Sequence, residues 1–139
     1  ATQLGLQRFI PLQCESSVVS PGPHSAQRWS RICLEACKQS RRLHLPTVAT
    51  PAAPATVAQQ FAPVLMAHPG GAGVREALAR FEDGAAITLM IGPEGGFTDA
   101  EAQQVQQLGG QTISLGEAIL RIETAAVALL AALRWGLVR

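Results

Sequence analysis

The sequence predicts an α/β fold with a mostly parallel sheet and helices on both of its faces. Short apolar runs, which are typical of buried strands, alternate along the whole chain with longer segments whose apolar residues recur every three or four positions. This alternation is typical of strand–helix–strand units. The 139 residues suffice for one domain, and a content of 47% hydrophobic and 15% charged residues excludes a disordered or fibrous chain.

The N-terminal half is expected to contribute two strands and two helices. Residues 8–13 are predicted to form a strand, and Pro11, which lacks a backbone N–H, places it at a sheet edge or near its own end. Residues 25–38 carry apolar side chains at three- and four-residue spacing, which predicts an amphipathic helix. Residues 47–49 form a possible short strand, and a proline-punctuated connection leads to a short helix over 57–61.

The C-terminal half repeats the alternation with sharper boundaries. The expected strands cover residues 64–67, 86–91 and 112–115, and the expected helices cover residues 74–81, 98–108 and 124–137. The first of these strands is predicted to end at the His68-Pro-Gly-Gly71 turn. Thr98 and Glu101 have the spacing of a capping box, in which a hydroxyl and a carboxylate satisfy free amides at a helix start.

The last expected helix has no polar face over residues 125–133. An apolar helix has to bury both of its sides, and a small sheet offers few elements that could cover the second side. The sequence therefore predicts that the chain forms a homodimer through the helix over residues 124–137.

Basic residues are concentrated in the first part of the chain. The net charge of +1 comprises six Lys/Arg against two Asp/Glu in residues 1–50 and five against eight in residues 51–139. Five of the six early basic residues lie between positions 28 and 42, on one helix and the loop that follows it. Such a cluster indicates a surface for a polyanion, although a solvated helix face explains the charges equally well.

Cysteine content and hydropathy indicate a soluble cytoplasmic domain. Three cysteines, Cys14, Cys33 and Cys37, are too few, and odd in number, for a disulfide-stapled secreted protein. No segment approaches the roughly 20 apolar residues that a membrane span needs, and no signal peptide opens the chain. Cys33 and Cys37 share a helix face and are expected to pack in the core, and no metal is expected because no ligand pattern surrounds them.

Three glycine-containing segments follow predicted strands and mark the expected binding site. They cover residues 67–71, 91–97 and 115–124. In α/β sheets, ligands bind outside the carboxyl ends of the strands, and glycine lets a ligand approach the backbone closely. Glycine-rich turns are also common as purely structural features. The 91–97 loop has neither the spacing of a dinucleotide site nor the Lys-Ser/Thr pair of a phosphate-binding loop, which argues against nucleotide phosphates as ligands.

Two of these segments carry a family resemblance. Ile91-Gly-Pro-Glu-Gly-Gly-Phe-Thr98 with Glu101, followed by Leu115-Gly-x-x-Ile-Leu-Arg-x-Glu-Thr-Ala125, resembles the paired signature of a ribosomal RNA methyltransferase family. Members of that family methylate N3 of a uridine in 16S ribosomal RNA with S-adenosylmethionine (SAM). The implied partner is therefore 16S ribosomal RNA or the small ribosomal subunit. The resemblance extends upstream over Ala1-Thr-x-Leu-Gly5, Ile10-Pro-Leu12, Glu15, Ser17, Glu35-Ala36, Gln39-Ser40, Arg42, Pro46 and His68-Pro69.

The resemblance implies the SPOUT fold, an α/β sheet with a trefoil knot near the C-terminus and an active site completed across a dimer. It implies that SAM lies among the knot loops, between glycine backbone and aliphatic side chains. His68 and Glu94 have an alternative role as residues that stabilise their own loops. The expected cofactor-binding residues are His68, Ile91, Gly92, Glu94, Gly95, Gly96, Leu115, Gly116, Ile119 and Leu120.

Arg121 and Glu123 are the expected catalytic residues. Methyl transfer to N3 of uridine needs positioned reactants and a deprotonated N3, and an arginine can orient or neutralise the uracil anion. Glu123 would hold Arg121 or help to remove the proton, but a structural ion pair at a helix start is the alternative. The expected RNA-binding residues are Arg41, Arg42 and Glu15.

The chain departs from the family pattern at three places. The family's N-terminal RNA-binding β-barrel has no counterpart, so residues 1–139 are expected to form one SPOUT methyltransferase domain. Ser16 replaces an arginine of the family's first turn, and Ala118 replaces another, next to an added Glu117. Two alternatives therefore stay open: another SPOUT RNA methyltransferase, for instance one that acts on a tRNA ribose 2′-hydroxyl, and a non-catalytic dimeric module that binds RNA or cofactor.

Overall fold

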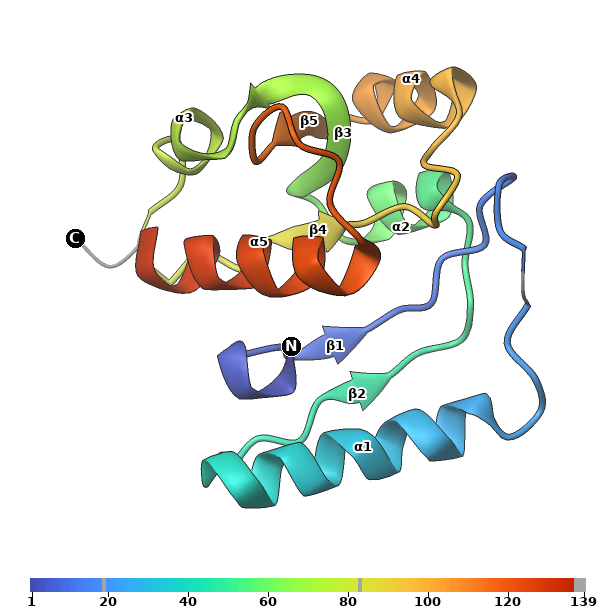
Figure 1. Cartoon of the computed structure of the whole chain (residues 1–139), viewed down its shortest axis with the longest axis vertical. Helices are drawn as coiled ribbons and strands as arrows, with labels where there is room; N and C mark the ends of the chain where they lie inside the picture. Colours follow the sequence, from blue (N-terminus) through green and yellow to red (C-terminus); the bar gives the residue numbers. More distant parts are fainter. Residues whose placement is uncertain (19, 83, 137–139) are drawn as a thin grey trace.

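The computed structural model describes residues 1–18, 20–82 and 84–136. Strands and helices alternate along the chain as the sequence predicts, which confirms the α/β fold class (Figure 1). The elements are η1 (Thr2–Leu4), β1 (Arg8–Phe9), α1 (Ser25–Ser40), β2 (Thr47–Val48), α2 (Pro54–Gln60), β3 (Val64–Gly73), α3 (Val74–Leu78), β4 (Thr88–Met90), α4 (Asp99–Gln107), β5 (Gln111–Ser114) and α5 (Ile122–Gly136).

All strand pairs are parallel, but the strands form two sheets. β1 pairs with β2, and β3 lies between β4 and β5 in the second sheet. In Figure 1, β1, β2 and α1 occupy the lower part of the molecule, and the β4-β3-β5 sheet lies above them. The expectation of a single sheet is therefore wrong. β1 is only two residues long, and a cleft separates it from β4.

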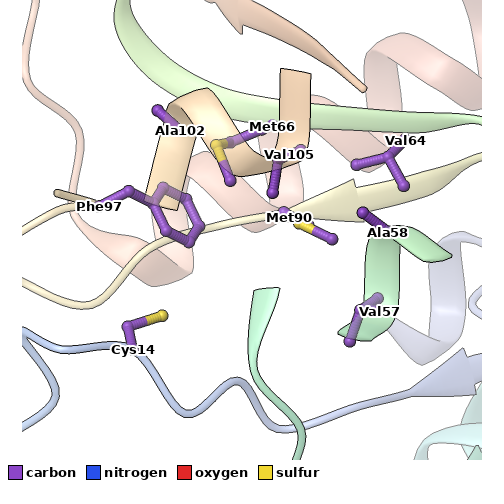
Figure 2. Close-up of a cluster of buried hydrophobic side chains, with 9 residues drawn as sticks. All are labelled: Cys14, Val57, Ala58, Val64, Met66, Met90, Phe97, Ala102 and Val105. Atoms are coloured by element: carbon purple, nitrogen blue, oxygen red, sulfur yellow. The ribbon is translucent and has the colours of Figure 1, made fainter. Parts of the chain in front are cut away.

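Helices cover both faces of the β4-β3-β5 sheet. Successive residues of β3 point to opposite faces, so Val64 and Met66 pack in one apolar cluster and Leu65 packs in the other. The second cluster joins α3 and α5 to the sheet through Leu78 and Leu129. Figure 2 shows the first cluster, which joins α2 and α4 to the sheet through the buried side chains of Cys14, Val57, Ala58, Val64, Met66, Met90, Phe97, Ala102 and Val105.

β3 is longer than the sequence predicts, because the chain resumes the strand after residues 68–71. Ala67 and Ala72 both lie opposite Ile113 of β5. Residues 68–71 between them therefore form a bulge that separates two paired stretches of β3. A Cβ atom on Gly71 would lie 2.6 Å from the backbone nitrogen of Ile113. Glycine thus lets the bulge return to β5, and the expectation that this turn ends the strand is wrong.

Other boundaries differ for local reasons. The predicted strand over 8–13 stops early because Pro11 has no amide to donate, and it continues only as an isolated bridge from Leu12 to Ala52. α2 begins at Pro54, in the first turn, where a helix tolerates proline. α3 ends at Leu78, and β4 spans Thr88–Met90. The predicted end of the last helix, Leu137, lies outside the described residues.

The three cysteines are buried free thiols, which confirms the packing role expected for Cys33 and Cys37. Within the described ranges, His, Cys, Asp and Glu side chains form no group of three or more that could hold a metal ion. A search of the same ranges finds no helix with the length and apolar character that a bilayer crossing requires.

Candidate functional site

The carboxyl ends of β3, β4 and β5 lie at the same edge of the sheet, because the three strands are parallel. Segments 92–97 and 115–121 follow β4 and β5 at this edge, and the 68–71 bulge lies beside the end of β5. In Figure 1, the connections that follow β4 and β5 both run on the side of the sheet where α5 begins. The fold thus gathers the three glycine-containing segments that the sequence singled out.

Each of these segments contains a glycine whose backbone is open. The φ angle is 76° at Gly70, 73° at Gly96 and 135° at Gly116, and no atom lies within 4 Å of a Cβ built on any of the three. Other residues rarely adopt such angles, and glycine leaves the neighbouring space free. A small molecule can therefore approach the backbone of all three segments.

The 92–97 loop is tightly folded and anchored in the core. The amide of Gly96 donates to the carbonyl of Pro93 at 2.8 Å, which closes a turn. Phe97, at the end of the loop, is buried in the cluster of Figure 2. A Cβ on Gly92 would lie 3.2 Å from the Phe97 ring, so the start of the loop also packs against this side chain.

A turn from the N-terminal part of the chain, Cys14–Ser17, lies against this loop. The Ser17 amide donates to the Cys14 carbonyl at 3.0 Å, and the Cys14 amide donates to Ser17 Oγ at 3.1 Å. Ser16 packs directly on Gly95, because a Cβ on Gly95 would lie 2.9 Å from Ser16 Cβ. The Cys14 side chain belongs to the same buried cluster as Phe97 (Figure 2).

The carboxylate of Glu101 bonds to both the turn and the loop. Its Oε2 accepts from the Thr98 amide at 2.9 Å, and Thr98 Oγ1 accepts from the Glu101 amide at 3.2 Å, which confirms the predicted capping box. Its Oε1 accepts from the Glu15 amide at 3.0 Å, across 86 residues of sequence. Sequence reasoning missed this second bond, since nothing in a capping motif indicates a distant donor.

Cys14 lies close enough to Glu101 to be affected by its charge. Burial, with a smaller contribution from the Glu101 carboxylate, raises the pKa of the Cys14 thiol from 9.0 to about 11, although a hydrogen bond with Ser17 acts in the opposite direction. This thiol is therefore protonated at neutral pH and acts as a small apolar side chain in the core.

Glu94 and His68 were each expected either to bind cofactor or to stabilise a loop. Glu94 is exposed, and in the described part of the chain no backbone amide donates to its carboxylate, so the loop-stabilising alternative gains no support for this residue. Glu101 has that role instead, because its buried position brings it within reach of two amides. His68 is half-buried, with Nδ1 lying 2.8 Å from the carbonyl oxygen of Pro69.

The segment between β5 and α5 is exposed along its length. Ile119 is 93% exposed, and Leu115 and Leu120 are also on the surface. Ser114 Oγ accepts from the Gly116 amide at 3.1 Å and donates to the Gly116 carbonyl at 2.7 Å, so the bonds that shape this segment are local. In the described single chain, these aliphatic side chains therefore do not enclose the apolar slot that was expected.

Arg121 and Glu123 lie at the start of α5. The Arg121 carbonyl accepts from the Ala125 amide at 2.8 Å, and Glu123 lies in the first turn, where its charge suits the helix dipole. Both side chains are exposed. No ion pair joins them in the part of the chain that the structure describes, which argues against a structural ion pair at this position.

The residues expected to bind RNA differ in their surroundings. Arg41 is exposed at the C-terminal end of α1, with φ 56°. The Arg42 guanidinium donates to the carbonyls of Thr2 and Leu6, so it fastens η1 to the loop after α1. The Glu15 side chain is exposed on the turn whose amide Glu101 holds.

A cleft of about 1500 Å³ lies between the two sheets. Residues of β1 and β4 line it, and Ile122 and Ala126 of α5 also contribute. Among the expected cofactor-binding residues, it is lined by Ile91, Gly92 and Glu94, whereas the other seven lie outside it. The cleft therefore touches the strand-end site only at the beginning of the 92–97 loop.

Open glycine backbone at the carboxyl edge of a parallel sheet is typical of α/β proteins that bind a small organic ligand. The sequence profile of the RNA methyltransferase domain matches residues 1–134, and the chain belongs to this family. It is 37% identical over 140 residues to ribosomal RNA small subunit methyltransferase E of Synechocystis. The aligned region covers 94% of this chain and 45% of that relative.

Two solved structures are similar to most of this chain. A methyltransferase from Legionella pneumophila in complex with SAM has a TM-score of 0.85 and 28% identity, covering 96% of this chain and 57% of that one. Ribosomal RNA small subunit methyltransferase E from Neisseria gonorrhoeae, bound to SAM, has a TM-score of 0.84 and 30% identity, covering 96% and 56%. The chain spans about half the length of these relatives.

Proposed function

We propose that this chain is the catalytic domain of a SAM-dependent enzyme that methylates N3 of a uridine in 16S ribosomal RNA. The observation that carries the proposal is the gathering of segments 68–71, 92–97 and 115–121 at one sheet edge, in a member of the RNA methyltransferase domain family. The relative from Synechocystis is named for the small-subunit ribosomal RNA, and the two structural neighbours hold SAM. The choice of uridine N3 follows from the resemblance of the two motifs.

The described residues fit SAM at this edge. Gly70, Gly96 and Gly116 present open backbone on three segments, which leaves room for the close approach of an adenosine and an amino-acid group. Leu115 and Leu120, at the rim, would supply apolar contacts if the 115–121 segment folds over the ligand. The chemistry that SAM supplies when bound is an electrophilic methyl group, so the protein's task is to position the uracil ring against it.

Arg121 and Glu123 are the residues proposed to act on the uracil. N3 of uridine is a weak acid, and the anion formed when it loses its proton is stabilised by a nearby guanidinium. Arg121 is exposed, free of an ion pair among the described residues, and is the last residue of the 115–121 segment, so it can turn towards a bound base. The proposed role of Glu123 is to hold Arg121 or to help remove the proton from N3.

The basic surface of α1 is proposed to contact RNA phosphates. Arg28, Arg31 and Arg41 are exposed, whereas Lys38 is paired with Glu35 at 2.9 Å. We expect a smaller contribution from Arg42, whose guanidinium is already bonded to two backbone carbonyls. RNA binding through such contacts would weaken steeply as salt concentration rises.

The dimer and the C-terminal knot are part of the proposal. The outer side of α5 exposes Val127 at 51% and Trp135 at 62%, and Ile119 precedes the helix at 93%. Exposed apolar side chains of this size favour burial against a second copy of the chain. The proposed dimer would act in the cytoplasm on the small ribosomal subunit. Such a dimer would also cover the 115–121 segment, which the single chain leaves open.

The test combines donor binding with transfer of a labelled methyl group to small ribosomal subunits that lack the modification. We expect micromolar SAM binding by calorimetry and one labelled N3-methyluridine per subunit. In Arg121→Ala, turnover should fall by roughly a hundredfold or more, as for the loss of one charge-stabilising group, while the Kd for SAM changes little. Arg75→Ala, an exposed arginine on α3, is the matched control and should keep normal turnover.

Each other outcome identifies an alternative. SAM binding without methylation of ribosomal RNA would support a non-catalytic module, which the serine at position 16 and the alanine at position 118 keep open. Label in a tRNA ribose would assign a different nucleic-acid substrate. Normal turnover in Arg121→Ala would remove this residue from the mechanism.

A further inference from the structure

We propose that Glu101 is a positioning residue, which holds the 92–97 loop in its donor-binding conformation by tying it to the turn Cys14–Ser17. This inference rests on the proposed function, in which the loop contacts SAM. Glu101 lies on α4, behind the loop, and does not need to touch the ligand. It would act through the two segments to which its carboxylate is bonded.

The two oxygens of the carboxylate serve two different segments. Oε2 accepts from the Thr98 amide at 2.9 Å, directly after the loop, and Oε1 accepts from the Glu15 amide at 3.0 Å, inside the turn. The residue is 7% exposed, and a buried charge is tolerated when such bonds satisfy it. A glutamine has a single acceptor oxygen and could keep only one of the two bonds.

Helix capping does not account for this arrangement. The capping box of α4 is complete with Oε2 and the Thr98 hydroxyl, so the bond from Oε1 to the turn is additional. The turn needs such a tie, because its other hydrogen bonds among the described residues, one in each direction between Cys14 and Ser17, are internal to it. Burial of the Cys14 side chain beside Phe97 is the second anchor of the turn (Figure 2).

The tie matters because the turn supports the backbone of the loop. Ser16 is in contact with Gly95, at a spacing that leaves no room for a Cβ. If the Glu15 amide is released, the turn can move away and Gly95 loses this support. The loop is then in the binding conformation in a smaller fraction of the molecules. The apparent Kd for the donor equals the intrinsic Kd divided by that fraction, so it rises.

The experiment compares Glu101→Gln with Thr98→Ala in the full chain. Both changes weaken the cap of α4. Thr98→Ala removes the hydroxyl, including its 3.4 Å bond to Oε2, but keeps the bonds from the two backbone amides to the carboxylate, so it controls for lost helix stability. For Glu101→Gln we expect the Kd for SAM, measured by calorimetry, to rise about tenfold, the effect of a loop that is competent roughly a tenth of the time. For Thr98→Ala we expect less than a twofold change.

Two further measurements separate positioning from simple loss of folded protein. In Glu101→Gln, the KM for SAM should rise with kcat retained at saturating SAM, whereas a smaller folded fraction would lower kcat and leave KM unchanged. Without any ligand, amide hydrogen exchange should accelerate in both residues 14–17 and 92–97 of Glu101→Gln, and in neither segment of Thr98→Ala. Ser17→Ala, which loosens the turn from its other end, should raise the Kd in the same direction.

Unchanged Kd and exchange in Glu101→Gln would overturn the inference, and so would equal effects in Thr98→Ala. If Glu101→Gln does not fold, an unchanged Kd in Ser17→Ala overturns it. If the unmodified chain binds no SAM, the proposed function fails and the positioning role falls with it. If the unmodified chain binds SAM and Glu101→Gln binds it equally well, the function stands and the inference alone fails.

Discussion

The 92–97 loop and the 115–121 segment leave the same edge of one sheet, yet the chain holds them very differently. The loop is packed against the Cys14–Ser17 turn, ends in the buried Phe97 and is tied through Glu101. The second segment is exposed throughout, with Ile119 at 93%, and its side-chain bonds are local. One half of the proposed donor site is therefore packed against the rest of the chain, and we expect the other half to be ordered only by a ligand or by the proposed second chain.

The largest expected effect comes from breaking the pre-formed half. In Gly95→Val, the new Cβ would lie 2.9 Å from Ser16 Cβ, and relieving this contact displaces the turn or the loop. Such overpacking costs about 1–3 kcal/mol, which predicts a ten- to hundredfold rise in the Kd for SAM measured by calorimetry.

Gly73→Val provides the control for Gly95→Val. Gly73 also lies near the sheet edge, at φ −59° and ψ 133°, and a Cβ there meets no atom within 4 Å. The Kd of Gly73→Val for SAM should stay close to that of the unmodified chain. An unchanged Kd for SAM in Gly95→Val would show that donor binding does not depend on the 92–97 loop.

The exposed half is tested through α5. Val127→Lys places a charge on the surface proposed to meet a second copy, and burying an unpaired charge costs several kcal/mol. We expect the dimer to weaken by at least about tenfold in sedimentation equilibrium. Hydrogen exchange should accelerate in residues 115–121 and stay unchanged in residues 92–97, because only the first segment relies on the partner.

Leu108→Lys is the matched control, since this leucine is 37% exposed at the end of α4. It should leave the dimer intact. A chain that is monomeric before any substitution would end the proposal of a dimer through α5.

The smallest expected effect is a loss of folding stability at high pH, which arises from Cys14 in the Cys14–Ser17 turn. Because burial raises the pKa of the Cys14 thiol from 9.0 to about 11, the unfolded chain releases this proton more readily than the folded one. The contribution of Cys14 to stability is therefore complete below pH 9 and is lost progressively as the pH rises towards 11. Urea unfolding at several pH values should show this decline in the unmodified chain and a weaker one in Cys14→Ala.

Local features of the fold were predictable because they depend on neighbouring residues. The alternation of strands and helices and the capping box at Thr98 and Glu101 follow from side-chain period and spacing. Bends and breaks were harder to predict. The sequence marks Pro11 as a strand limit, but it does not show that a strand interrupted after Ala67 resumes at Ala72, which requires Gly71 to pass close to β5.

The candidate site was predictable in part. Glycine-rich segments after strands indicated its place, since parallel strands end at a common edge. The sequence could not assign the carboxylate that stabilises the 92–97 loop: Glu94 lies in the loop but is exposed, and Glu101 lies outside it and is buried. It also could not show that Arg42 is used to hold η1.

By itself, the amino-acid sequence determined the α/β class, the glycine-bearing segments and the local start of α4, because each depends on residues a few positions apart. Tertiary structure decided which segments meet and which stay apart. It separates β1 from β4, brings Ser16 into contact with Gly95, and lets the Glu15 amide donate to the Glu101 carboxylate. The physical reason is that a hydrogen bond or a packing contact depends on distance in space, and a separation of 86 positions along the sequence leaves no periodic trace of it.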